Sequence, residues 1–584
     1  MGFGEWGLGS GVWRVRKSSR VLDPFEILLQ TLAGALNPSQ FSIQHFRNSS
    51  FAVNPQSAIL SATFPPLNHI QILSFAALTV ASVGGAQGRP AHTPDATRVR
   101  ESVRAYRIAH QTEIVRELAS LLEIPNVASD TAAIRRNADA LLNMLRRRGI
   151  TAQTLDAPGN LPAVFGELRV PGARRTVVLY AHYDGQPVDT ARWATPPWSP
   201  TLRDKPIEDG GRVVDFPSAP RAEFGDEWRI YARSASDDKA PIIAMLSALD
   251  ALRAARIAPT VNIKFFFEGG EEAGSPNLQQ LLVRHKNLLA ADAWIFSDGP
   301  VHQSRKMQVV FGVRGSYGVE VTVYGPSRAL HSGHYGNWAP NPASTIASLL
   351  ASMRDADGKI LIAGFLDDVK PMTDADRRAI DGVPNNDADL RHALTLGATE
   401  GGGARLAERI MLPAVNIRGI RAGQVGELAS NTIHTEARAS IDFRLVPAQT
   451  PERIRELVES HVKAQGYYIV YAEPTADERR SNARVIRLEW ENGYPALRTD
   501  MDLPVSRAVI SAVEGAVGGP VIRVPILGGS LPMALFQETL GVPLIIVPIV
   551  NHDNNQHAAN ENLRIRNLWD GIEVMAGIMT GLRF

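Results

Sequence analysis

The chain of 584 residues is predicted to adopt an α/β fold, in which helices cover both faces of a mostly parallel sheet and a smaller α+β domain is inserted. Helical and strand-like segments alternate through its first half, as in parallel strands joined by helical crossovers. The strands read as nearly continuous apolar runs, which is typical of a sheet buried on both faces. After Gly299 the pattern changes to longer strands, and alternation returns near Tyr494. We therefore expect one α/β domain interrupted by a second domain.

The elements of the first domain follow from their periodicity. Helices are predicted at residues 98–122, 131–148, 240–256 and 277–289, and strands at 176–181, 261–267 and 293–296. The returning part adds a strand at 542–550 and a terminal helix from residue 563. The predicted domain boundaries are 97–311 and 494–584 for the α/β domain and 312–493 for the insertion.

The insertion has its own signals. Residues 307–324 read as a pair of long strands around Gly315, and residues 437–445 alternate as a half-buried strand does. A helix is expected near Asn341-Pro342 and another at Thr450-Pro451, where a hydroxyl cap precedes proline in the first turn. Strands of this kind between helices predict an α+β unit.

The first 96 residues differ from the rest and are expected to form an irregular extension. Residues 70–86 are a short apolar run that ends on small residues, as a secretory signal peptide does, and it is too short for a comfortable membrane span. A signal peptide begins near its own initiator, so we expect the true start near residue 67 and a signal peptide at 67–86. The protein is then exported, without stable membrane insertion after processing. The alternative is an extension with one buried apolar segment in a cytoplasmic protein.

Composition limits the classes of function. The formal net charge is only +1, so nothing favours a nucleic-acid partner. The chain has no cysteine, which excludes disulfides, thiolate metal sites and cysteine nucleophiles. Histidine, aspartate and glutamate are therefore the strong metal ligands that remain.

Two adjacent acids, Glu271 and Glu272, directly follow the apolar strand that ends in Phe265-Phe266-Phe267. Paired carboxylates at the mouth of a buried strand are costly to desolvate unless a cation neutralises them. Alone, the pair would more often be a solvated loop. Its meaning depends on whether other ligands occur at comparable positions.

Four further segments with potential ligands lie just past predicted strands. Each alone has a simpler explanation, as a hydrogen-bonded histidine or a helix cap. Their polar residues are His182 with Asp184, Asp237 with Asp238, Asp298, and His557. Asp184 is placed to hold the second ring nitrogen of His182. Two histidines with three carboxylates suit a pair of divalent ions, of which zinc is the usual one.

These segments resemble those of the di-zinc metallopeptidase family that includes carnosinase-type dipeptidases, glutamate carboxypeptidases, aminoacylases and succinyl-diaminopimelate desuccinylases. The resemblance covers about residues 100–584 and is nearest to the dipeptidase branch, because of His182-Tyr183-Asp184-Gly185-Gln186-Pro187 and Arg444-Leu445-Val446-Pro447. It implies a zinc-exopeptidase-like catalytic domain with an inserted lid and dimerisation domain. It also implies two zinc ions, with manganese or cobalt as alternatives.

The resemblance also implies the role of each residue. Asp237 would bridge both ions, His182 and Asp298 would complete one site, and Glu272 and His557 the other. Glu271 would be the general base, and Asp184, beside His182, is counted with it among the catalytic residues.

In the inserted domain, the resemblance implies that His331, within Leu330-His331-Ser332-Gly333, reaches the site of a partner subunit in a homodimer. Arg444 would bind the carboxylate of the substrate, assisted by Gly529 and Ser530. Without the resemblance, Arg444 could equally be an ordinary surface ion pair.

The sequence also departs from the family pattern. Ala232-Arg233-Ser234 and Ala240 replace glycine-containing positions around the bridging aspartate, and Gly270 stands where an acid often precedes the pair. Residues 204–227 read as a loop insertion at the rim of the pocket. These departures bear on substrate choice, since none removes a ligand or the base.

We therefore expect a dinuclear hydrolase that cleaves dipeptides or short peptides with a free C-terminal carboxylate. An N-acyl amino-acid hydrolase or desuccinylase would use the same metals and differ only in pocket contacts. A non-catalytic binding homologue, or a purely structural metal, is a further alternative. The presence of Glu271 beside all the ligands argues against both.

Overall fold

A computed structural model describes residues 95–219 and 222–584. The predicted signal peptide at 67–86 and nearly all of the irregular extension lie outside the described residues. Among the helices that are described, none combines the length and apolar character that a membrane crossing needs.

A large eight-stranded sheet organises the α/β part, in the order β1-β2-β6-β3-β7-β19-β8-β18. Its strands are β1 (Thr151–Leu155), β2 (Ala163–Leu168), β3 (Thr176–His182), β6 (Asn262–Glu268), β7 (Ala293–Phe296), β8 (Gln308–Val310), β18 (Ile522–Val524) and β19 (Leu544–Ile546). The four central strands, β6, β3, β7 and β19, are parallel. Antiparallel pairs join β1, β2 and β6 on one side and β19 to β8 on the other.

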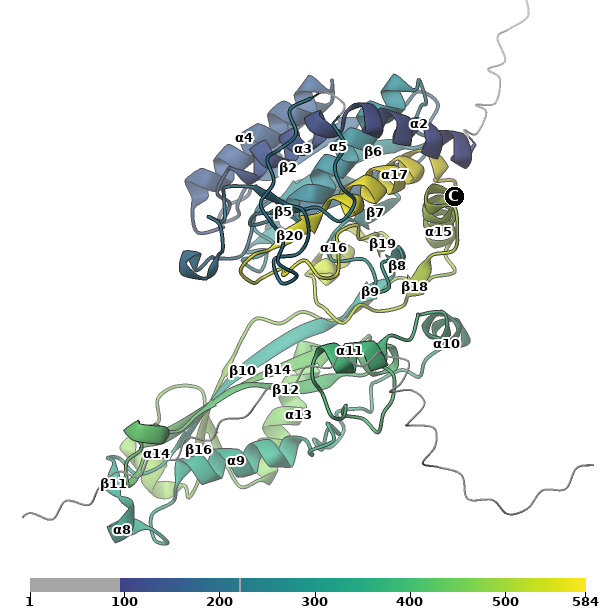
Figure 1. Ribbon diagram of the computed structural model, residues 1–584. Coiled ribbons are helices and arrows are strands. Elements are labelled where there is room, and N and C mark those ends of the chain that lie inside the picture. The colour runs from purple at the N-terminus through teal and green to yellow at the C-terminus, as the bar shows by residue number, and fades with distance from the viewer. Residues whose placement is uncertain (1–94, 220–221) are drawn as a thin grey trace, which may run out of the picture. The chain divides into compact units, whose positions relative to one another are not determined.

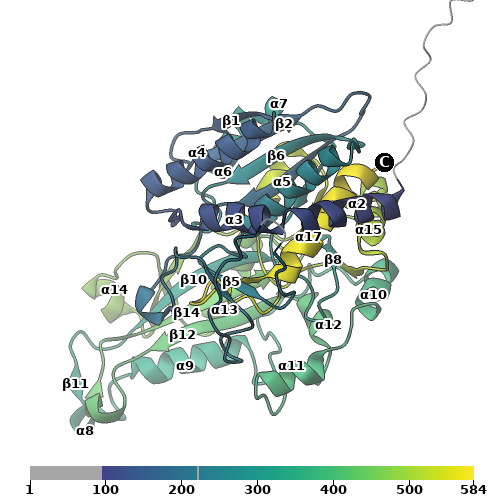
Figure 2. The ribbon, with the colours of Figure 1, turned by 45° about the horizontal axis from the view of Figure 1, so that its top comes forward.

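Helices cover both faces of this sheet, as predicted. They are α2 (Ala96–Ala109), α3 (Gln111–Leu122), α4 (Thr131–Arg147), α5 (Lys239–Ala254), α6 (Leu278–Arg284), α7 (Lys286–Leu289), α15 (Pro504–Val517), α16 (Met533–Leu540) and α17 (Ile565–Gly581). Figures 1 and 2 show α5 and α17 side by side over one face.

Strand β3 shows why its apolar run is continuous. Val177, Leu179 and Ala181 enter the core beneath α5 and α17. Val178 and Tyr180 point the other way, into a second core that contains Phe536 of α16. Because side chains alternate between the faces of a strand, a sheet covered on both faces needs apolar residues at every position.

The structure corrects several predicted elements. The helix expected at 98–122 is two helices that meet at His110, and the strand expected at 542–550 covers only Leu544–Ile546. Strands β1 and β2 were not predicted. β1 is the edge strand and is mostly not buried, so its apolar signal is weak, whereas β2 beside it is buried over residues 163–166 and gives only a short apolar run.

The inserted part is built on a five-stranded sheet in the order β12-β14-β10-β16-β15. Its strands are β10 (Gly315–Tyr324), β12 (Ala414–Arg421), β14 (Glu436–Leu445), β15 (Tyr468–Val470) and β16 (Val485–Trp490). Helices α9 (Pro342–Met353) and α13 (Pro451–Ala464) have the predicted starts, and both contribute to a core separate from those of the large sheet. Shorter helices are α10 (Asp374–Asp381), α11 (Asp387–Ala393), α12 (Leu406–Ile410) and α14 (Ala476–Ser481).

The two strands predicted on either side of Gly315 belong to different sheets. Residues 308–310 belong to the large sheet, whereas β10 begins the five-stranded sheet. A Cβ on Gly315 would lie 2.6 Å from the carbonyl oxygen of Tyr494, so glycine permits the two chain segments to cross there. The domain boundaries at 311/312 and 493/494 stay predictions.

Candidate metal centre

The four central parallel strands bring the predicted ligands together. Parallel strands end at the same edge of a sheet, and residues just beyond those ends share one site. His182 ends β3, Glu271 and Glu272 follow β6, Asp298 follows β7, and His557 lies in the loop after β19. Asp237 and Asp238 come directly before α5, between β5 (Arg229–Tyr231) and that helix.

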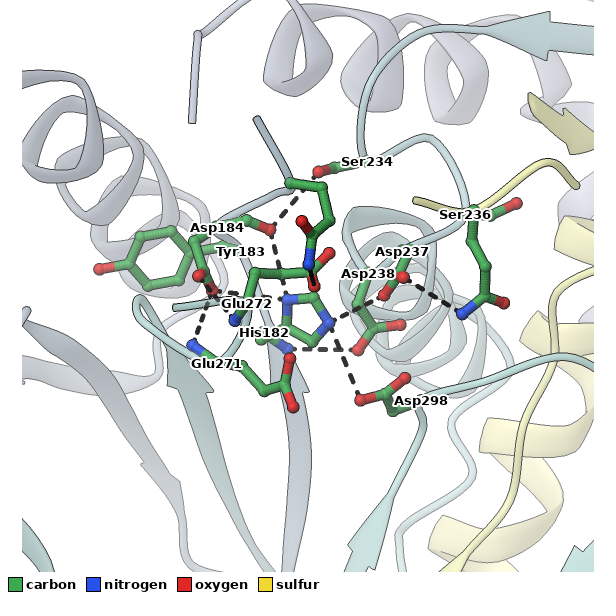
Figure 3. Close-up of polar contacts among 12 residues, drawn as sticks. His182, Tyr183, Asp184, Ser234, Ser236, Asp237, Asp238, Glu271, Glu272 and Asp298 are labelled. Atoms are coloured by element: carbon green, nitrogen blue, oxygen red, sulfur yellow. Dashed lines mark hydrogen bonds and ion pairs between the residues drawn. The ribbon is translucent and has the colours of Figure 1, made fainter. Parts of the chain in front are cut away.

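Three buried residues form a first group of potential ligands: His182, Asp237 and Asp298. Nε2 of His182 lies 2.9 Å from Oδ1 of Asp237 and 3.8 Å from Oδ2 of Asp298. Figure 3 shows the carboxylates of Asp237 and Asp298 directed toward the same nitrogen of the imidazole ring.

A second group shares Asp237 with the first and adds Glu272 and His557. Nε2 of His557 lies 3.1 Å from Oδ2 of Asp237 and 3.3 Å from Oε2 of Glu272. Asp237 therefore presents one carboxylate oxygen to each group.

Asp184 holds both parts of the site in place. Its Oδ1 lies 3.5 Å from Nδ1 of His182, on the side of the ring away from Asp237. The same carboxylate accepts hydrogen bonds from the backbone N–H groups of Glu271 and Glu272, at 3.1 and 3.0 Å. One buried side chain thus sets both the ring of His182 and the loop of the paired acids.

The site concentrates negative charge that no lysine or arginine of the described residues neutralises. Within the described part of the chain, no lysine or arginine forms an ion pair with its six carboxylates, which belong to Asp184, Asp237, Asp238, Glu271, Glu272 and Asp298. Burial raises the pKa of Glu272 to about 7 and that of Asp298 to about 6, and the charge of Asp237 adds to both shifts.

The donors fit divalent cations. Oδ2 of Asp298, which belongs to the first group, is buried without a hydrogen-bond partner among the described residues. Imidazole nitrogens and carboxylate oxygens are ligands that zinc and similar divalent ions accept. A cation would supply the positive charge that six clustered carboxylates need.

Glu271 is placed as the free member of the acid pair. Neither ligand group includes it, yet its neighbour Glu272 belongs to the second. Burial, with the negative charges of Asp298 and Glu272, raises the pKa of Glu271 well above its ordinary value. A carboxylate whose pKa is raised is better suited to exchange protons near neutral pH.

A residue that the sequence analysis missed, Glu561, supports the loop of Asp237. Its fully buried carboxylate accepts hydrogen bonds from the backbone N–H groups of Ser234, Ser236 and Asp237, at 2.9, 3.0 and 2.9 Å. Arg233 adds a charged hydrogen bond of 2.7 Å from Nη1. The only sequence signal was its position four residues after His557.

Other missed residues are two glutamines. Nε2 of Gln186 donates to Oε2 of Glu272 at 2.7 Å, and Nε2 of Gln556 donates to Oδ2 of Asp237 at 3.3 Å. Both stand next to recognised motif residues, but an amide carries no charge that would single it out in a sequence. The predicted insertion at 204–227 also approaches the site loop, where Asn555 donates to Glu208 at 3.2 Å.

The predicted carboxylate-binding residues lie together. Nη1 of Arg444 donates to Oγ of Ser530 at 2.8 Å, and its Nε donates to Asp442 at 2.9 Å. The carbonyl of neighbouring Gly529 accepts from the backbone N–H of Arg314 at 3.2 Å. Arg444 is thus more than a surface ion pair, because it joins β14 to the segment after β18.

His331 does not join this site within the single chain. It ends the short strand β11 (Leu330–His331), which pairs with β13 (Thr432–Ile433), and it is exposed. Its Nδ1 accepts from the N–H of Gly333 at 3.0 Å, and no contact with the ligand groups occurs among the described residues.

Comparison with known proteins agrees with this geometry. Residues 178–581 match the model of peptidase family M20/M25/M40. The matched residues make up more than half of the chain. The chain is 25% identical over 480 residues to the Cys-Gly metallodipeptidase dug1 of Schizosaccharomyces pombe, covering 79% of this chain and 94% of the relative. It is 27% identical over 440 residues to the Beta-Ala-His dipeptidase of Mus musculus, covering 74% and 81%.

A solved structure is similar as well. The M20 family metallo-carboxypeptidase Sso-CP2 from Sulfolobus solfataricus superposes with a TM-score of 0.65 at 27% identity, covering 80% of this chain and 99% of that one. The chain therefore belongs to peptidase family M20/M25/M40, and it is a peptidase similar to the metallodipeptidases of that family.

Proposed function

We propose that this protein is a dinuclear metallohydrolase that cleaves dipeptides or short peptides bearing a free C-terminal carboxylate. The proposal rests on one observation above all. Two groups of donors share Asp237, and Glu271 stands beside them outside both groups. The names of the relatives, which include two kinds of dipeptidase, support the substrate class.

The two ligand groups assign the metals. His182 and Asp298 would hold one ion, Glu272 and His557 the other, and Asp237 would contribute one oxygen to each. Zinc suits this donor set best, with manganese or cobalt as alternatives. When bound, a pair of divalent ions polarises the scissile carbonyl and lowers the pKa of the attacking water.

Residues of the chain transfer the proton and bind the substrate. Glu271 takes a proton from the attacking water and gives it to the leaving amine, as a general base and then a general acid. Asp184 keeps Glu271 in position by accepting its backbone N–H. Arg444, with Ser530 and Gly529, binds the free carboxylate, for which a planar guanidinium is geometrically suited.

We further propose a homodimer formed through the inserted domain, in which His331 acts in the site of the partner subunit. Its exposure at β11 and its lack of contact with its own ligand groups support this arrangement. Export by a signal peptide at residues 67–86 is also part of the proposal, and it rests on the sequence pattern alone.

The test is the variant Glu271→Gln. It should keep the full metal content but lose about 10²- to 10⁴-fold in kcat, because it removes only the proton transfer. Metal content is measured on the purified protein. Turnover is measured on dipeptides, N-acyl amino acids and amidated peptides, with zinc, manganese or cobalt added back after chelation.

Each turnover result supports or contradicts one part of the proposal. A Glu271→Gln variant with kcat near that of the wild type would exclude the assigned base. Faster turnover of N-acyl amino acids than of dipeptides would favour the deacylase alternative. Equal turnover of amidated and free peptides would contradict recognition of the carboxylate.

A further inference from the structure

A cavity of about 820 Å³ lies in the inserted part, beside the first residues of β12. Residues of α11 and α12 and the loop between them form much of its wall. Five arginines line it, against two acids: Arg314, Arg354, Arg391, Arg405 and Arg409, with Asp387 and Glu400. The lining therefore carries three more positive than negative charges.

Most of these arginines lack a counter-charge. Arg354 is paired with Glu400 at 2.6 Å. The other four form no ion pair within residues 95–219 and 222–584. The second acid, Asp387, instead accepts the backbone N–H of Leu406 at 3.0 Å. The positive charge of the cavity is thus largely uncompensated by the chain itself.

Arg314 is the most unusual member, because it is only 9% exposed. It donates from Nε to the carbonyl of Ile410 at 2.9 Å and from Nη2 to that of Arg409 at 3.3 Å, and it forms no ion pair with any described residue. Burial, with the charge of nearby Arg444, lowers its pKa to about 10, although the charge of Asp442 acts in the opposite direction. Burying a cation that no ion pair neutralises is costly, so a bound anion would stabilise this arrangement.

Two more arginines retain unused donors. Nε of Arg405 is buried without a partner among the described residues, while its Nη1 and Nη2 donate to the carbonyls of Ile380 and Val383. The side chain of Arg409 donates no hydrogen bond to any described residue. No described residue occupies the guanidinium group of Arg409, so it can bind a ligand in the cavity.

Part of the remaining wall is apolar. Leu394 and Leu396 line the cavity although they are 57% and 46% exposed, and Leu390 and Leu406 lie beside them. A ligand that fits both walls has an anionic group and an apolar body.

The cavity adjoins the proposed carboxylate-binding residues. Ala414, on its wall, is the β-sheet partner of Arg444. The backbone N–H of Arg314 donates to Gly529, next to Ser530. An anion bound in the cavity would therefore lie close to the residues that hold the substrate.

We propose that this cavity binds the carboxylate or phosphate group of an organic anion that also carries an apolar part. Such a group could belong to a separate small molecule or to an acidic side chain of the substrate. Binding of an acidic side chain of the substrate rests on the proposed peptide hydrolysis, whereas binding of a separate small molecule does not.

The experiment uses Arg409→Gln, because Arg409 contributes to no ion pair that its loss would break. Arg421→Gln is the matched control, since Arg421 is an exposed arginine of β12 outside the cavity. Phenyl phosphate and inorganic phosphate are titrated calorimetrically into the metal-loaded full chain. In parallel, kcat/KM is measured for Ala-Glu and Ala-Leu.

We expect Arg409→Gln to weaken phenyl phosphate binding about tenfold, the loss for one charge-assisted hydrogen bond, and Arg421→Gln to leave it unchanged. Phosphate bound at the metals cancels in this comparison. If the source is the substrate, the preference for Ala-Glu over Ala-Leu falls about tenfold instead. Either result supports the anion site.

The proposal is overturned if Arg409→Gln changes neither phenyl phosphate binding nor the ratio of the two dipeptides relative to Arg421→Gln. Failure to hydrolyse any peptide would contradict the proposed function. In that case the comparison of phenyl phosphate binding between Arg409→Gln and Arg421→Gln alone shows whether the cavity binds an anion.

Discussion

At the scale of single residues, the site depends on buried carboxylates that bind the backbone of the loops carrying the proposed ligands. Asp184 accepts two backbone N–H groups from the acid pair, and Glu561 accepts three from the loop of Asp237. A carboxylate that accepts hydrogen bonds from several backbone N–H groups holds a loop in one conformation, because those buried N–H groups need partners. The proposed ligands thus owe their positions to buried carboxylates that belong to neither ligand group.

We predict that Glu561→Gln weakens metal binding by about 10- to 100-fold, as loss of an outer partner of a ligand typically does. The amide would direct an NH₂ group toward a backbone N–H, which leaves that donor unpaired. Zinc affinity is measured by competition with a chelator.

The matched control is Glu573→Gln in α17. Glu573 is also buried and pairs with Arg104 at 2.8 Å, but it touches none of the ligands. Normal zinc affinity in a folded Glu561→Gln variant would exclude the positioning role.

At the scale of elements, the loop that carries His557 is anchored at its start. Asp553 accepts hydrogen bonds from Arg229 of β5 at 2.6 Å and from Arg564, the last residue of β20 (Asn562–Arg564), at 2.8 Å. Burial would raise the pKa of Asp553, but these two guanidinium groups hold it well below its ordinary value. The ionised carboxylate therefore ties the loop to the small sheet in the order β20-β5-β4, in which β4 is Thr201–Arg203.

This anchor predicts a pH dependence of stability. A carboxyl whose pKa is lowered by folding stabilises the fold above its ordinary pKa of about 4, and the contribution is lost as the pH falls toward the lowered value. Because the Asp553 side chain is 37% exposed and solvent screens its ion pairs, Asp553→Asn should cost about 1 kcal/mol at neutral pH and progressively less below pH ~4. Thermal unfolding at a series of pH values measures the difference.

Asp477→Asn serves as the control for that series. Asp477 forms an ion pair with Arg480, but its side chain is 90% exposed, and such pairs contribute little to stability. If the gap between Asp553→Asn and the wild type did not narrow on acidification, the ion pairs would not be the cause.

At the scale of the whole molecule, the proposed homodimer would bring His331 of one chain to the ligand groups of the other. His331 is exposed on β11, away from the ligands of its own chain. Exposed apolar side chains occur in the same inserted part, with Trp338 80% and Val425 88% exposed. Such residues would be covered in a dimer formed through this part of the chain.

The dimer predicts complementation between two inactive variants. In a mixed dimer of His331→Ala and Glu271→Gln, one of the two sites would combine an intact Glu271 with an intact His331. Random exchange of subunits in equal amounts should then restore about a quarter of the wild-type activity. Sedimentation measures the oligomeric state of each mixture.

The complementation is informative only if each variant alone is folded and dimeric. No recovery after subunits have exchanged would contradict the action of His331 across the interface. A monomer in sedimentation would contradict the dimer itself.

Much of the fold was predictable because it follows from local patterns. The continuous apolar run of β3 predicts a strand buried on both faces, and Thr450-Pro451 predicts the start of α13. The edge strand β1 was missed because its partly exposed residues carry a weak signal, and β2 was missed because its apolar run is short. The crossing at Gly315 was missed because it depends on contact with Tyr494, which is far away in the chain.

The sequence by itself determined the ligand types, since a chain without cysteine offers His, Asp and Glu, and it placed them after apolar strands. Only the tertiary structure decided which atoms meet. The parallel order β6-β3-β7-β19 gathers four strand ends at one edge, so Asp237 faces His182 with one oxygen and His557 with the other. The roles of Glu561 and Arg314 required the structure for the same reason. Their partners are distant in sequence, and burial, which makes their charges matter, is a property of the folded chain.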